Sequence, residues 1–163
     1  MIVAHDIYSE TNPAYGTYAL TMFVKGFIAA NGAGPELPAA YLALPVAMSG
    51  DLAASFNGTN KNTGLLEWLD RSPQIQLGLA DRVNRSMEIV TAAVRLACFT
   101  QTLALALVDG ARLQAGTQKL KKSPIAALSS DTANAIKHAE RMGYWFATAG
   151  STRSVFDAMG LTL

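Results

Sequence analysis

The chain has 163 residues, a length that fits one domain with a sizeable core, and we expect residues 1–163 to form a single domain. Its 13 basic and 12 acidic side chains leave a formal net charge of +1, which excludes a global attraction to nucleic acid or to an anionic membrane. Charged residues make up only 15% of the chain, against about 25% in an average soluble domain. Either small residues such as alanine or a partner protein must therefore cover the surface.

The first predicted helix starts with Asn12 as N-cap and Pro13 at its first position, and it continues to about Ala30. Apolar residues occupy nearly its whole circumference, with a single lysine as the only charge. Such a helix is either central in its own fold or half buried by a second chain, and complete self-burial is difficult in a small domain. This helix is therefore the leading interface candidate, through Leu20, Phe23, Val24, Phe27 and Ile28.

The middle of the chain predicts several short helices separated by loops. A first helix near 37–43 is expected to end before Pro45, and a second covers about 49–56. The polar segment 57–62 predicts a surface loop. Further helices are expected at a segment capped by Thr63, at 72–84 after a Ser-Pro start, and at 87–102.

Residues 103–115 carry the one convincing strand pattern. A three-residue loop, Val108 to Gly110, closes a hairpin in which Gly110 adopts the left-handed conformation. This loop places Leu105 opposite Leu113 and makes one face of the hairpin entirely apolar. The fold class is thus mainly α, a compact multi-helix domain with one small β-hairpin.

Three helices followed by a hairpin is also the order of a winged helix, which is the specific architectural alternative. A basic segment follows the hairpin and could contact phosphate through Lys119, Lys121 and Lys122. Three lysines near a loop are more often ordinary solvated charge.

A long helix is expected from Ser130 or Asp131, followed by a left-handed break at Gly150 and a short helix capped by Ser151. Aromatic residues lie on both helices. Tyr144, Trp145 and Phe156 are candidates either for the core or for a partner interface. For Trp145 the core is favoured.

A search for reactive groups finds no recognisable catalytic or metal-binding pattern. His5 and His138 lack neighbours at metal-ligand spacing, and His138 is expected on a helix surface or at the edge of the core. The sequence contains neither a phosphate-binding loop nor a hydrolase nucleophile elbow. Asp81 and Arg85 have the spacing of an ion pair on one helix face. We therefore expect no enzymatic activity, no cofactor and no metal.

The single cysteine, Cys98, cannot form an internal disulfide, and its apolar neighbours favour a core thiol in a reducing compartment. The N-terminal sequence is charged and polar where a secretory signal needs an apolar run. Lys25, Arg95 and Gln101 interrupt the most apolar stretches well short of a membrane span. These features predict a cytoplasmic protein without a membrane segment.

Five landmarks occur in an order that resembles the middle component of three-component ABC systems, which are bacterial conflict operons with an SMC-like ATPase and an effector. The landmarks are Asn12-Pro13-Ala14, Leu42 to Pro45, Leu65 to Leu69, Gly78 to Val83, and Ala139 to Leu161. The resemblance covers most of the chain. It implies a non-catalytic adaptor that holds an SMC-like ABC ATPase and an effector in one anti-phage or anti-plasmid defence complex. A DNA-binding winged helix acting through the hairpin and the basic segment is the alternative, and self-association into a homo-oligomer is expected of apolar faces left uncovered.

Overall fold

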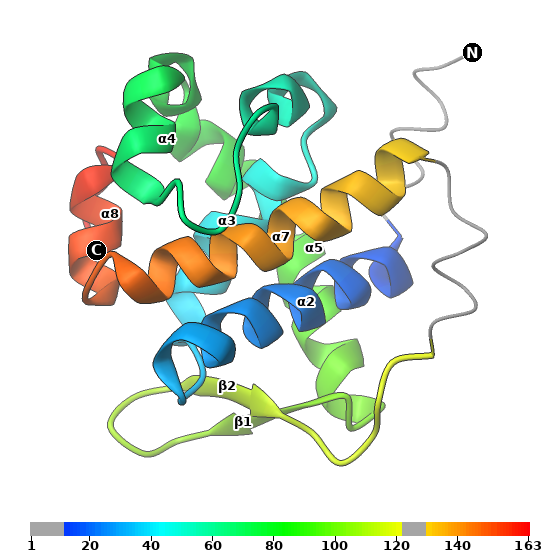
Figure 1. The fold of residues 1–163 in the computed structure, drawn as a ribbon. Helices are drawn as coiled ribbons and strands as arrows, with labels where there is room; N and C mark the ends of the chain where they lie inside the picture. The colour runs from blue at the N-terminus through cyan, green and yellow to red at the C-terminus, as the bar shows by residue number, and fades with distance from the viewer. Residues whose placement is uncertain (1–11, 122–129) are drawn as a thin grey trace.

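The computed structural model describes residues 12–121 and 130–163, and within them the chain is mainly helical with one two-stranded hairpin (Figure 1). The fold class is as predicted. The elements in chain order are α2 (Pro13–Asn31), α3 (Leu37–Ala47), the 3-10 helix η1 (Gly50–Phe56), α4 (Leu65–Arg71), the 3-10 helix η2 (Pro73–Gln76), α5 (Leu79–Phe99), β1 (Leu103–Ala106), β2 (Arg112–Ala115), α7 (Ser130–Thr148) and α8 (Thr152–Ala158).

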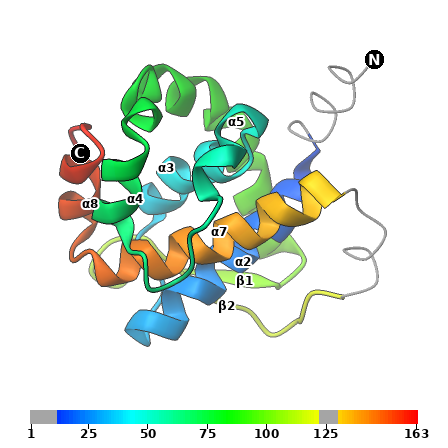
Figure 2. The same cartoon turned by 45° about the horizontal axis from the view of Figure 1, so that its top comes forward.

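The long helices α2 and α7 lie side by side and run in the same direction, although about a hundred residues separate them in sequence (Figures 1 and 2). Glycines allow their backbones to touch. A Cβ built on Gly26 would lie 2.0 Å from the carbonyl oxygen of Glu140, and one on Gly143 would lie 2.0 Å from that of Phe23. This close approach brings the apolar side chains of both helices into one core.

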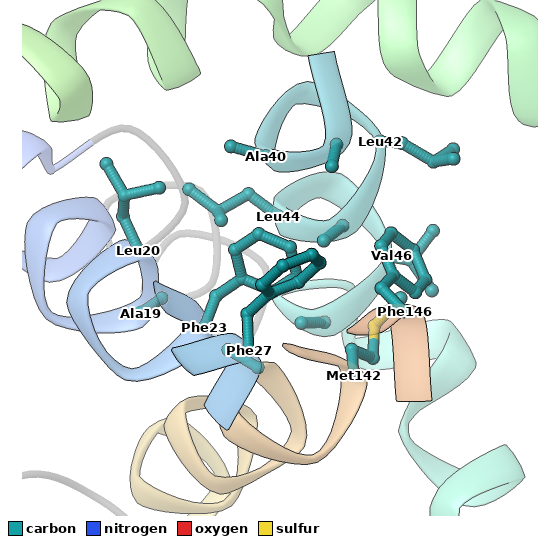
Figure 3. Packing of buried hydrophobic residues seen from close by; sticks show 14 of the residues in the cluster. Ala19, Leu20, Phe23, Phe27, Ala40, Leu42, Leu44, Val46, Met142 and Phe146 are labelled. Carbon is teal, nitrogen blue, oxygen red and sulfur yellow. The ribbon is translucent and has the colours of Figure 1, made fainter. Parts of the chain in front are cut away.

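The core forms where α2 and α7 cover α3 (Figure 3). Phe23 of α2 meets Phe146 of α7 edge to face, with ring centroids 5.7 Å apart. Leu42, Leu44 and Val46 of α3 are buried beside them. An all-round apolar helix such as α3 must be enclosed, and here α2, α5, α7 and α8 all contact it.

Local signals predicted several boundaries correctly. The Asn12 side chain accepts a hydrogen bond from the Ala14 N–H at 3.0 Å and caps α2. The Ser151 side chain caps α8 in the same way, and Gly150 adopts a φ of 110°. These features depend only on neighbouring residues, which explains why the sequence reveals them.

Two helix predictions in the middle of the chain are wrong. Pro45 lies inside α3, which continues to Ala47, because burial of Val46 and Ala47 outweighs the lost backbone hydrogen bond. The helices expected at 72–84 and 87–102 are instead η2, a left-handed Gly78, and the continuous helix α5. Asn84 and Arg85, at the expected break, are exposed residues within α5. The three-helix order expected of a winged helix is therefore not formed as predicted.

The hairpin has the predicted register, with Leu103 opposite Ala115 and Leu105 opposite Leu113. Gly110 has the predicted positive φ, 98°, and Asp109 is also left-handed. The outer edge of β2 is hydrogen-bonded to the segment before α3, through Leu113 N–H to the Pro35 carbonyl at 2.9 Å. Leu103 and Leu113 are buried, so the base of the hairpin seals the core, while its far end extends beyond the core.

Candidate partner-binding surfaces

Most residues predicted to form an interface are core residues instead. The structure buries six of the eight, with little or no exposed side chain: Leu20, Phe23, Val24, Phe27, Trp145 and Phe156. The expectation of an uncovered apolar face on the first helix is therefore wrong for these positions. The physical reason is that α7, α3 and α5 together enclose α2, and the two glycine contacts let α7 approach closely enough to do so.

Ile28 and Tyr144 are the two predicted interface residues that stay half-buried. Tyr144 lies under Lys61, whose Nζ is 5.7 Å from the ring centroid, which is a cation–π distance. Ile28 lines an apolar groove of about 840 Å³ between α2 and the base of the hairpin. We call this depression the α2–hairpin groove. Its lining includes Met22, Leu103 and Leu120, together with Lys25.

Lys119 also lines the α2–hairpin groove, and both Lys119 and Lys121 are exposed. Lys122 lies outside the described residues. The Tyr18 hydroxyl donates to the Lys121 carbonyl oxygen at 3.2 Å, which ties this end of the basic segment to α2. Lys119, one of the lysines that suggested phosphate contact, thus lies beside an apolar groove on the helical body.

A second depression, of about 460 Å³, lies between α3, η1 and the N-terminal half of α5, and we call it the α5 cleft. Arg82 donates two hydrogen bonds to the Asp51 carboxylate, at 2.8 and 3.2 Å, and a further one to the Ser49 hydroxyl. These bonds from Arg82 are the largest cause that lowers the pKa of Asp51 below its ordinary value. The cleft also contains Arg85 and the exposed Leu77.

The ion pair predicted between Asp81 and Arg85 is not formed, although both residues line the α5 cleft. Neither charge is paired with another described side chain. The cleft therefore offers one unpaired cation and one unpaired carboxylate beside apolar residues, a mixture suited to recognising a polar protein surface. The α2–hairpin groove and the α5 cleft share no lining residue.

His138 belongs to an aromatic cluster. Its ring stacks on Phe56 with centroids 4.1 Å apart and an interplanar angle of 5°, and the Trp145 ring is also nearly parallel to Phe56, with centroids 6.0 Å apart. Burial, with the charge of Arg141 as a second cause, lowers the pKa of His138 to about 4. The imidazole is therefore neutral near pH 7, and its Nδ1 is buried without a hydrogen-bond partner among the described residues. It is a histidine at the edge of the core, as predicted.

Two side chains of α7 anchor the loop 57–62, and one of them belongs to the aromatic cluster. Trp145 Nε1 donates to the Asn60 carbonyl oxygen at 3.0 Å, and Arg141 donates to the Thr59 hydroxyl at 2.9 Å. The loop is exposed as predicted, but α7 anchors it at two points.

Within the described parts of the chain, no three histidine, cysteine or acidic side chains lie together as a metal site. No single helix there is long and apolar enough to cross a membrane; only α3 and η1 taken together meet the length and composition criterion, and they are bent by 95° at their junction. Cys98 is half-buried at the end of α5, and burial raises the pKa of its thiol.

The most exposed large apolar side chains lie at positions that the sequence did not single out as an interface. Leu107 and Val108, at the far end of the hairpin, are 78% and 71% exposed, and Phe99, where α5 leads into β1, is 86% exposed. The alternation of the hairpin placed Leu105 and Leu107 on one apolar face. It could not show that this face extends beyond the core.

The described residues form a mainly helical fold with a small hairpin, several surface depressions of different chemistry and exposed leucines on the hairpin. Residues 2–163 match the family described as ABC-three component (ABC-3C) system Middle Component 3, and the chain belongs to that family. Membership of a three-component system implies protein partners. Neither a curated protein nor a solved structure matches the chain.

Proposed function

We propose that this chain is a non-catalytic adaptor that joins an SMC-like ABC ATPase to an effector in a bacterial anti-phage or anti-plasmid complex, and that it acts in the cytoplasm. Membership of the middle-component family supports a role between two other components. The single observation that carries the proposal is that two of the surface depressions, the α2–hairpin groove and the α5 cleft, share no lining residue. The α2–hairpin groove is apolar, whereas the α5 cleft presents the charges of Asp81 and Arg85, so the two suit partners of different chemistry.

The mechanism is steric and allosteric. A partner that moves during ATP hydrolysis changes which contacts are available on the adaptor, and the second partner responds only if its affinity differs between the two arrangements. The rigid core formed by α2, α3 and α7 lies between the two depressions and keeps them at a fixed separation.

One substitution introduced at three positions tests the proposal. Leu77→Glu alters the α5 cleft, Leu120→Glu alters the α2–hairpin groove, and Leu163→Glu is the matched control at an exposed leucine in neither depression. Each variant is co-expressed with the ATPase and the effector encoded beside it, and the complex is isolated through a tag on the adaptor.

The first two variants are expected to lose different partners, each by about tenfold or more, because a charge enters an apolar contact, while the control retains both. Recovery of neither partner with the unaltered chain would refute the adaptor role. Equal behaviour of all three variants would instead refute the assignment of the two depressions.

A further inference from the structure

The α2–hairpin groove combines an apolar base with positive charge. Val24 of α2 and Leu103 of β1 are almost fully buried and form its base, and Ile28 is half-buried beside them. Lys25 lines the groove from α2, Lys119 lines it from the segment after β2, and both lysines are exposed. No aspartate or glutamate is among the described residues that line it. An occupant therefore meets apolar side chains and two cations, without a carboxylate that would repel an anion.

Both lysines are available to a new anion. Lys119 forms no ion pair with any side chain in the described ranges. Lys25 has one such partner, Glu140 of α7, at 3.9 Å, and the two side chains are 67% and 40% exposed. Because a pair this long and this exposed contributes little, a carboxylate from another protein can replace Glu140. Glu140 itself does not line the groove.

The hydrogen-bonding groups in the lining are largely used within the chain. The Thr21 and Thr102 hydroxyls donate to carbonyl oxygens of α2 and α5, at 2.8 and 3.1 Å. The N–H groups of Gly116 and Gln118 donate to carbonyl oxygens at 3.0 and 2.9 Å. An extended segment in the groove would bring its own N–H and C=O groups against apolar walls, which is costly. An α-helix satisfies its backbone internally and presents only side chains, so a helix suits this groove better.

We propose that the α2–hairpin groove holds an amphipathic α-helix of a partner subunit, with aspartate or glutamate residues beside its apolar stripe. Thr21, Lys25 and Ile28 are the groove-lining residues along one stripe of α2, and they span about two helical turns, or about 10 Å. Apolar anchors at positions i, i+3 or i+4, and i+7 of the incoming helix match this length. Met22 adapts to the shape of the anchors, because its side chain is flexible. The carboxylates of the helix lie beside Lys25 and Lys119.

The same lining favours a protein over nucleic acid. Duplex binding depends on the neutralisation of several phosphates, whereas the groove has two lysines and the whole chain has a formal net charge of only +1. A sugar–phosphate backbone would also leave the apolar surface of Met22, Ile28 and Leu120 uncovered. The inference rests on the proposed adaptor function, and it adds the chemistry of the segment that this groove recognises.

Carbodiimide cross-linking tests the proposal directly, because this reagent joins a carboxylate to an amine only where the two are in contact. The complex of the full chain with the ATPase and the effector encoded beside it is treated, and the linked peptides are identified by mass spectrometry. Lys25 and Lys119 are expected to be joined to aspartate or glutamate within one short segment of one subunit. Lys137, which is exposed on α7 and outside the groove, is the matched control and should not be joined to that segment.

Charge reversal tests whether the contact contributes to binding. Lys119→Glu is compared with Lys137→Glu, which changes the net charge equally at another exposed lysine. The dissociation constant for the subunit that carries the cross-linked segment is expected to rise about tenfold in Lys119→Glu and less than about twofold in Lys137→Glu. This difference should shrink as NaCl is raised from about 50 to about 500 mM, because salt screens charges at the edge of an interface. Lys119→Arg keeps the charge and should bind like the unaltered chain.

Three results would overturn the proposal while the adaptor role stands, because in each of them the subunits are still recovered together. The first is a complex in which neither Lys25 nor Lys119 is joined to another subunit. The second is an equal dissociation constant for Lys119→Glu and Lys137→Glu. The third is a loss of binding to a DNA duplex in Lys119→Glu with no change in subunit binding, which would make nucleic acid the occupant. Recovery of neither subunit with the unaltered chain would instead refute the adaptor role, and this inference with it.

Discussion

The contact between α2 and α7 predicts that Gly143→Ala severely destabilises the fold. The added Cβ would lie 2.0 Å from the Phe23 carbonyl oxygen and 2.9 Å from the Phe27 nitrogen, and both are backbone atoms that no side-chain rotation can move. An ordinary contact begins near 3.4 Å, so the helices must separate by about 1.4 Å. That shift opens the packing between Phe23 and Phe146 at the centre of the core.

Overpacking of this kind costs about 3 kcal/mol or more, against a gain of about 1 kcal/mol from replacing glycine by alanine within a helix. We expect a net loss of at least about 2 kcal/mol in the free energy of unfolding, and a fall in Tm of about 4–8 °C. The assay is urea unfolding followed by circular dichroism.

Gly16→Ala in α2 is the matched control. Its Cβ would meet only the Ala93 side chain at 3.0 Å, so its free energy of unfolding should stay within about 1 kcal/mol of the unaltered chain. If Gly143→Ala is as stable as this control, the close backbone contact does not hold the two helices together.

Three further predictions follow from the buried and paired groups. The pKa of His138 in the folded state is about 4, below its ordinary value of 6.5, so the unfolded state takes up the proton first as the pH falls. The free energy of unfolding should therefore fall between about pH 6.5 and pH 4. In a pH series of urea melts, His138→Gln should remove this part of the pH dependence. The partly exposed pair of Arg82 and Asp51 should contribute only about 0.5–1 kcal/mol, measured by a double-mutant cycle with methionine and asparagine replacements; a coupling near zero would show that the bidentate geometry is not maintained in solution. Trp145→Phe removes the hydrogen bond to Asn60, so the 57–62 loop should exchange its amide hydrogens faster while α8 does not change, and uniform acceleration across the chain would indicate global destabilisation instead.

The parts of the fold that local chemistry controls could be predicted from the sequence. Asn12 and Ser151 cap their helices through hydrogen bonds to residues two or three positions away, and the loop around Gly110 fixes the hairpin register. Pro45 and the continuity of α5 could not be predicted in this way, because packing against distant elements overrides the local breaks.

The candidate surfaces were harder to predict because exposure depends on partners that are distant in sequence. The apolar circumference of α2 was recognised correctly, but its burial depends on the close approach of α7 at Gly26 and Gly143. The glycines of the two helices were a signal for this close approach. They can be recognised as such only when it is known that α2 packs against α7. For β1, alternation identified the apolar face, whereas its reach past the core depends on where the helices end.

The pairing of α2 with α7 also has a consequence for synthesis on the ribosome. α2 is synthesised about a hundred residues before α7, so the core contacts of Phe23 and Phe27 with α7 cannot form until residues beyond 146 have left the exit tunnel. A nascent chain that has been synthesised only as far as the hairpin would expose the apolar side chains of α2 that α7 covers in the complete fold. It would depend on chaperones until α7 is made. Truncation anywhere before Gly143 should therefore yield an insoluble product.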